Sequence, residues 1–152
     1  MAFRLEIISI LINFNYEKIA IALLAILFFS ANSFAQCEKK QTYTASKVEF
    51  LNEDGTVHHS DQGKVVVEIS PKEIMINHND NEQDRMKGEV KDFKCDWKVP
   101  NKDGITTLKA MLQENSGDLK DATLSIEGKN GQLTILLNIE GRIVKIYVDK
   151  VE

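Results

Sequence analysis

Hydrophobic and polar residues alternate along most of the chain from residue 43 onward. Valine, isoleucine and leucine occupy every second position, mostly with lysine, threonine, serine or glutamate between them. This period is clearest at 65–69, 74–76, 108–112, 122–126, 133–139 and 144–148. A period of two is typical of strands that bury one face and expose the other. The pattern therefore predicts an all-β domain.

Short polar segments separate the hydrophobic runs. Asn130-Gly131 lies between the runs that end at Ile126 and begin at Leu133. Asn and Gly accept the positive φ angles of a two-residue turn, so a β-hairpin is expected there. Further turns are predicted at 53–56, 61–63, 101–104, 115–118 and 140–141.

Two segments allow more than one interpretation. In 86–99, Val90 occupies an even position, whereas Phe93, Cys95, Trp97 and Val99 occupy odd ones. A β-bulge near Lys91-Asp92 would bring both sets to one face of a single long bent strand. Segment 107–115 contains helix-favouring residues, but its even apolar positions fit a strand better.

The spacing of the runs indicates about eight or nine short strands with near-neighbour connections. We therefore expect a single antiparallel meander that closes as a small barrel, with a β-sandwich as the alternative. At most one short helix is expected in this domain.

The first 35 residues differ from the rest. Lys18 precedes an uninterrupted apolar run at 19–29, and Ser33 and Ala35 provide the small residues of a cleavage site before Gln36. These features predict a signal-peptide helix at 1–35, and a translation start placed too early would explain the unusual residues 1–17. The remaining 36–152 would form one β domain without a stable membrane span.

Export to the periplasm or full secretion would follow from such a leader. Two alternatives stay open. Residues 5–29 could form an N-terminal membrane anchor, although Glu6, Glu17 and Lys18 would be costly at membrane depth. Cys37 could instead carry a lipid, although Phe34 and Gln36 do not match the preferred residues of a lipoprotein signal.

The composition is that of an ordinary globular protein. The 152 residues are 43% hydrophobic and 28% charged, with a formal net charge of −4. This excludes a disordered, collagen-like or polytopic membrane protein. Nucleic acid is not an expected partner, because Lys and Arg (19) are fewer than Asp and Glu (23).

Cys37 and Cys95 are the only cysteines, and both would remain after cleavage. An oxidising compartment favours a disulfide between them. It would close a loop of about 59 residues and stabilise the fold by about 4 kcal/mol in the chain-entropy model. Two idle thiols or a catalytic thiol are the alternatives. The second is disfavoured by the absence of Cys-x-x-Cys and by apolar neighbours of Cys95, which raise a thiol pKa.

Metal sites and catalysis find little support. His58, His59, His78 and Asp61 could contribute metal ligands, but adjacent histidines on an extended segment point to opposite faces. Residues 80–84 resemble a calcium loop but lack the required Gly and Glu further along. No nucleophile, phosphate-binding or dinucleotide motif is present in the sequence. We therefore expect no cofactor, no metal, no catalytic residue and no enzyme activity.

A ligand pocket is the remaining candidate site. Phe50, Phe93, Trp97 and Tyr147 are the large side chains of an otherwise aliphatic interior and would line it, unless the interior is a filled core. By analogy of fold with lipocalins, we expect a binding module for a small, partly apolar molecule, although the lipocalin Gly-x-Trp motif is absent. The alternative is a protein interaction module or inhibitor that binds an envelope protein through a sheet edge or loop surface.

Overall fold

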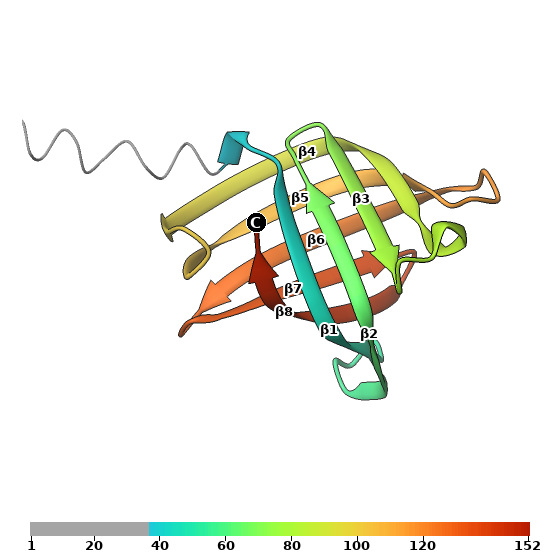
Figure 1. Cartoon of the computed structure of the whole chain (residues 1–152), viewed down its shortest axis with the longest axis horizontal. Coiled ribbons are helices and arrows are strands. Elements are labelled where there is room, and N and C mark those ends of the chain that lie inside the picture. The colour runs from blue at the N-terminus through green and yellow to red at the C-terminus, as the bar shows by residue number, and fades with distance from the viewer. Residues whose placement is uncertain (1–36) are drawn as a thin grey trace, which may run out of the picture. The chain divides into compact units, whose positions relative to one another are not determined.

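The computed structural model describes residues 37–152, which form one closed antiparallel β-barrel (Figure 1). Its elements are β1 (Gln41–Leu51), β2 (Val57–Ile69), β3 (Glu73–His78), a 3-10 turn η1 (Glu82–Asp84), β4 (Met86–Val99), β5 (Asp103–Gln113), β6 (Leu119–Lys129), β7 (Gln132–Ile139) and β8 (Arg142–Val151). Each strand pairs with its sequence neighbours, and β8 pairs with β1. The predicted meander and its closure as a barrel are confirmed. The predicted leader, 1–35, lies outside the described residues.

The β6–β7 hairpin shows how the alternating pattern builds the core. Leu124 and Ile126 on β6, and Leu133, Ile135 and Leu137 on β7, are each at most 6% exposed. Asn130 and Gly131 have φ angles of 53° and 77° and connect the strands as a two-residue turn. The predicted hairpin and its inward face are therefore confirmed.

Strand β4 contains two irregularities. The register shifts between Val90 and Asp92, where the β-bulge was predicted. It shifts again between Trp97 and Val99, which the sequence did not reveal. Beyond this second shift, odd-numbered side chains of β4 no longer point inward. The expected burial of Val99 is therefore wrong, since its side chain is 46% exposed.

Of the predictions for 107–115 and 61–63, the first is confirmed and the second is wrong. Segment 107–115 mostly belongs to strand β5 and alternates between inward and outward side chains, as the preferred interpretation expected. The turn predicted at 61–63 is wrong, because β2 runs without interruption through these residues. A tertiary contact explains the glycine at position 63, which interrupts the apolar pattern. A Cβ atom there would lie 2.6 Å from the Asn79 Oδ1 atom.

The meander places its turns at two ends of the barrel. The β2–β3, β4–β5 and β6–β7 turns lie at the end where the described chain begins, which we call the closed end. The β1–β2, β3–β4, β5–β6 and β7–β8 connections lie at the opposite end, called the open end. In Figure 1 the β4–β5 turn is at the left and the β3–β4 connection at the right. The two ends differ in packing, and this difference defines the candidate site.

Candidate ligand cavity

The closed end is filled by the disulfide and aromatic side chains. Cys37 and Cys95 are bonded, with their Cα atoms 5.8 Å apart, so the predicted disulfide is confirmed. Beside it, Trp97 is 4% exposed and its Nε1–H donates to the Thr106 hydroxyl over 2.7 Å. The void left among these side chains measures only about 10 Å³. With its sulfur in the disulfide, Cys37 cannot also carry a thioether-linked lipid.

Tyr43 also packs at the closed end, on β1. It is 3% exposed, and this burial raises the pKa of its hydroxyl to about 12. The side chain therefore stays neutral at physiological pH. It belongs to the packing that closes this end of the barrel.

The open end contains a cavity of about 680 Å³. This volume lies within the usual range for sites that bind small molecules. The wall consists mainly of inward aliphatic side chains, among them Val48, Val65, Ile76, Leu137, Val144 and Ile146. At the mouth, Phe50 is 38% exposed and its ring stacks on His59, with centroids 6.0 Å apart. Glu53, His58, His78, Glu114 and Arg142 line the same mouth.

The unequal strand lengths explain why the wall opens here. Strand β2 has 13 residues, whereas its neighbour β3 has six. Pairing between them ends at Val65 and His78, so residues 57–62 of β2 pair with β1 alone. The β1–β2 hairpin therefore extends beyond the wall formed by β3 (Figure 1).

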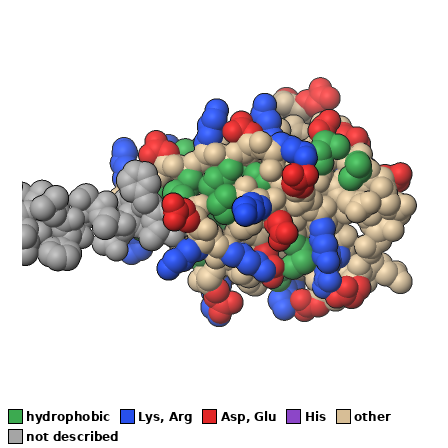
Figure 2. Space-filling model, turned by 90° about the horizontal axis from the view of Figure 1, so that it is seen from above, with side chains coloured by type: hydrophobic (Ala, Val, Ile, Leu, Met, Phe, Trp, Pro, Cys, Tyr) green, Lys and Arg blue, Asp and Glu red, His purple; other side chains and the backbone are tan. Residues whose placement is uncertain are grey.

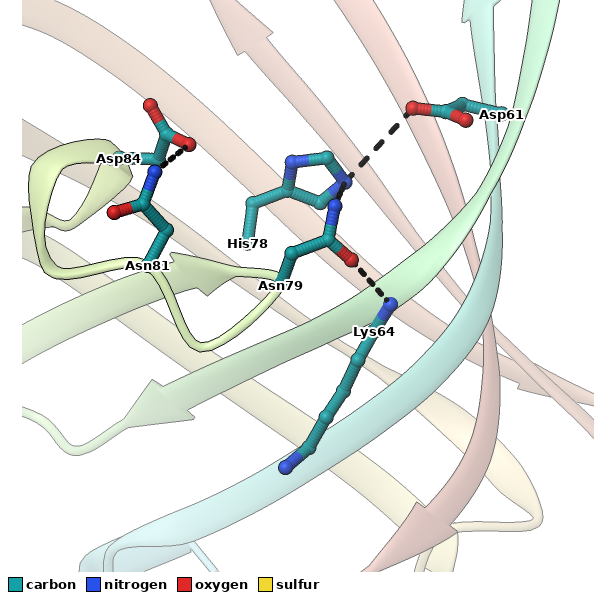
Figure 3. A network of polar contacts seen from close by, with 6 residues as sticks. All are labelled: Asp61, Lys64, His78, Asn79, Asn81 and Asp84. Carbon is teal, nitrogen blue, oxygen red and sulfur yellow. Dashed lines mark hydrogen bonds and ion pairs between the residues drawn. The ribbon is translucent and has the colours of Figure 1, made fainter.

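At the mouth of the cavity, a network of polar contacts connects β2 with the end of β3 (Figure 3). The Asn79 side-chain oxygen accepts a hydrogen bond from the Lys64 backbone N–H at 2.9 Å. The His78 Nε2 atom lies 3.4 Å from the Asn79 side-chain nitrogen and 3.9 Å from an Asp61 oxygen. Sequence reasoning missed Asn79 and the role of Gly63. A glycine inside an alternating strand is the one signal that indicates such a close approach.

The histidines and the acidic loop were the candidate metal ligands. Within 37–152, no group of three or more His, Cys, Asp or Glu side chains is arranged to hold a metal ion. In the acidic loop, the Asn81 side-chain nitrogen donates to Asp84 at 2.7 Å, and its oxygen caps η1 by accepting from the Gln83 N–H. These polar groups therefore form hydrogen bonds with one another around η1.

The four aromatic residues predicted to share a pocket are separated. Phe50 lies at the mouth of the cavity, whereas Phe93 and Trp97 lie at the closed end. Tyr147 lies on the outer face of β8, since the inward positions of that strand are even-numbered, as at Ile146. That alternation was visible in the sequence and could have placed Tyr147 outside.

On the outer face, Tyr147 joins a polar cluster across the β1–β8 seam. Its hydroxyl donates to the Glu49 carboxylate at 2.7 Å, and the Lys47 ammonium lies 2.6 Å from the other carboxylate oxygen. The ammonium groups of Lys47 and Lys145 lie 4.8 and 5.0 Å from the centre of the Tyr147 ring. Hydrogen bonds from Lys47 and Tyr147 hold the pKa of the Glu49 carboxyl below its usual value.

This cluster predicts a pH-dependent stability. A lowered carboxyl pKa in the folded state stabilises the fold above the unfolded pKa, and the effect is lost as the pH falls through the folded value. Glu49→Gln should therefore lower the urea midpoint at pH 7, and the difference from wild type should shrink in increasingly acidic buffer. Glu127→Gln, at an exposed position on β6, is the control. A wild-type advantage that does not change with pH would contradict this role of Glu49.

The outer wall of the barrel carries charges of both signs. In Figure 2, hydrophobic side chains on one face lie among interspersed lysine or arginine and acidic side chains. A hollow of about 1020 Å³ over the β2–β3 turn, β3 and β4 has the same mixed character and includes Lys72, Glu73, Lys87 and Glu89. The cavity at the open end is the more apolar of the two.

Among residues 37–152, no helix combines the length and apolar character needed to cross a bilayer. A disulfide is compatible with an oxidising compartment. No protein-family model, curated protein or solved structure matches the chain.

Proposed function

We propose that this protein is an exported, non-enzymatic carrier that holds one small, partly apolar molecule inside its barrel. The observation that carries the proposal is the cavity of about 680 Å³ at the open end. Its walls are aliphatic and its mouth is polar, as expected for a ligand with an apolar body and a polar head. Periplasmic or secreted placement rests on the predicted leader and is supported by the disulfide.

The contrast between the two ends supports a cup rather than a channel. The disulfide and Trp97 leave almost no space at the closed end, whereas the open end has room for a ligand. A ligand would therefore enter and leave through the four connections of the open end. Apolar surface buried at about 25 cal/mol per Å² would supply most of its affinity.

A protein interaction module is the alternative function. That hypothesis depends on a sheet edge or a loop surface that could bind a partner. Pairing of β8 with β1 joins the two terminal strands of the meander, although residues 57–62 of β2 pair with β1 alone and leave a short edge. The cavity has the size and apolar lining of a small-molecule site, so it provides the stronger basis for a function.

Filling part of the cavity should weaken ligand binding. Val144 lines its wall, so Val144→Phe should weaken binding of the neutral dye N-phenyl-1-naphthylamine by at least about tenfold. Fluorescence titration measures the affinity. Native mass spectrometry of protein extracted under mild conditions should show a retained small molecule in wild type and less in the variant.

Val66→Phe is the matched control, because Val66 lies outside the buried face of β2 and does not line the cavity. Its dye affinity should equal that of wild type. Unfolding midpoints for both variants show whether each remains folded. Equal dye binding by folded Val144→Phe and wild-type protein would contradict the cavity as the binding site.

A further inference from the structure

Negative charge is concentrated at the open end of the barrel. The segments that form this end, 52–64, 79–86, 114–118 and 140–142, contain nine acidic and three basic residues, a formal charge of −6 with histidine neutral. Residues 37–152 as a whole carry −4, so the remainder of the domain carries +2. The connections around the cavity mouth therefore carry an excess of carboxylates, and we call these four segments the acidic collar.

Local ion pairs leave part of the collar uncompensated. Lys64 pairs with Asp80, Arg85 with Glu82, and Lys120 on β6 with Glu114. Among the described residues, no ion pair involves Glu53 or Glu140, and Glu53 lines the mouth itself. An excess of one sign of charge around a cleft attracts ligands of the opposite sign.

The mouth also offers an aromatic ring. Phe50 is partly exposed and lines the cavity together with Glu53, with one face of its ring stacked on His59. Aromatic faces attract ammonium groups, and quaternary ammonium ligands are bound in this way. A carboxylate and an aromatic ring above an aliphatic cavity together suit a cationic head on an apolar tail.

We infer that the cavity selects amphiphiles with an ammonium head group over anionic amphiphiles of the same length. This inference rests on the proposed function and specifies its ligand class. Among the described residues, Arg142 is the one lysine or arginine that lines the mouth, beside three histidines, and it would favour an anion. Its charge is outnumbered by the six collar carboxylates that form no ion pair with a lysine or arginine among the described residues. The apolar tail would occupy the aliphatic cavity and the head would remain at the collar.

Displacement of bound N-phenyl-1-naphthylamine tests the inference. Decyltrimethylammonium and decyl sulfate share a tail length and differ in head charge, and both are used below their micellar concentrations. The ammonium compound should displace the dye at a concentration at least about tenfold lower in low-salt buffer. This preference should shrink in about 0.5 M salt, which screens exposed charges.

Charge-neutralising variants connect the preference to the collar. Glu53→Gln combined with Glu140→Asn should reduce the preference several-fold. Asparagine suits the positive φ of 50° at position 140. Glu127→Gln combined with Asp149→Asn removes the same charge from exposed positions outside the collar and should leave the preference unchanged.

The outcomes separate the two proposals. If the dye binds but decyl sulfate displaces it as well as the ammonium compound does, the inference is wrong and the proposed function stands. An equal loss of preference in both double variants would also overturn the role of the collar. If neither the dye nor either amphiphile binds, as checked by direct calorimetric titration, the proposed function and this inference both fail.

Discussion

Reduction of the Cys37–Cys95 disulfide is expected to lower the free energy of unfolding by about 4 kcal/mol. The two cysteines are 58 residues apart, so the bond removes a large amount of conformational freedom from the unfolded chain. In a domain of this size, such a loss should lower the midpoint temperature by more than about 10 °C. Thermal unfolding with and without a phosphine reductant measures the shift.

The double variant Cys37→Ser/Cys95→Ser is the control for this measurement. It should unfold at the midpoint of the reduced wild type and should not respond to the reductant. Under denaturing conditions, unreduced wild-type protein should yield no titratable thiol. Two titratable thiols in protein purified from an oxidising compartment would contradict the assignment.

Ile135→Ala should destabilise the barrel by about 2–5 kcal/mol. Ile135 lies in the middle of β7, has no exposed surface, and faces Ile126 and Ile146 on the neighbouring strands. Truncation removes buried methyl and methylene groups and leaves a void that surrounding side chains fill only partly. Urea unfolding at equilibrium measures the loss.

Thr134→Ala, one residue earlier on β7, is the matched control. Thr134 lies on the outward face and pairs with Glu127 and Tyr147 on the neighbouring strands. Its truncation should cost less than about 0.5 kcal/mol. Similar losses at positions 134 and 135 would mean that the register of β7 is wrong.

The two ends of the barrel divide the tasks of stability and binding. The closed end holds the disulfide, Trp97 and Tyr43 in tight packing. At the open end, aliphatic side chains surround an unfilled volume. They therefore make fewer van der Waals contacts and contribute less packing energy. The disulfide at the opposite end offsets part of this loss, because it lowers the conformational entropy of the unfolded chain.

Local chemistry explains why much of the fold could be predicted. The alternation at 122–126 and 133–139 defines two strand faces, and Asn130-Gly131 between them sets their register. The change of parity between Val90 and Phe93 revealed one β-bulge. With only two cysteines in the chain, a single intramolecular disulfide was possible. Each inference used neighbouring residues or a simple count.

Tertiary structure alone decided which side chains share a site. The register shift after Ala45 on β1 reverses the inward parity, so that Tyr43 packs at the closed end and Phe50 reaches the mouth. Gly63 looked like a turn residue until β3 brought Asn79 against it. The cavity and the acidic collar arise from barrel closure and from unequal strand lengths. Both features depend on contacts between segments that are distant in the sequence. An alternating pattern does not specify such contacts, because it shows only on which face of its strand each residue lies.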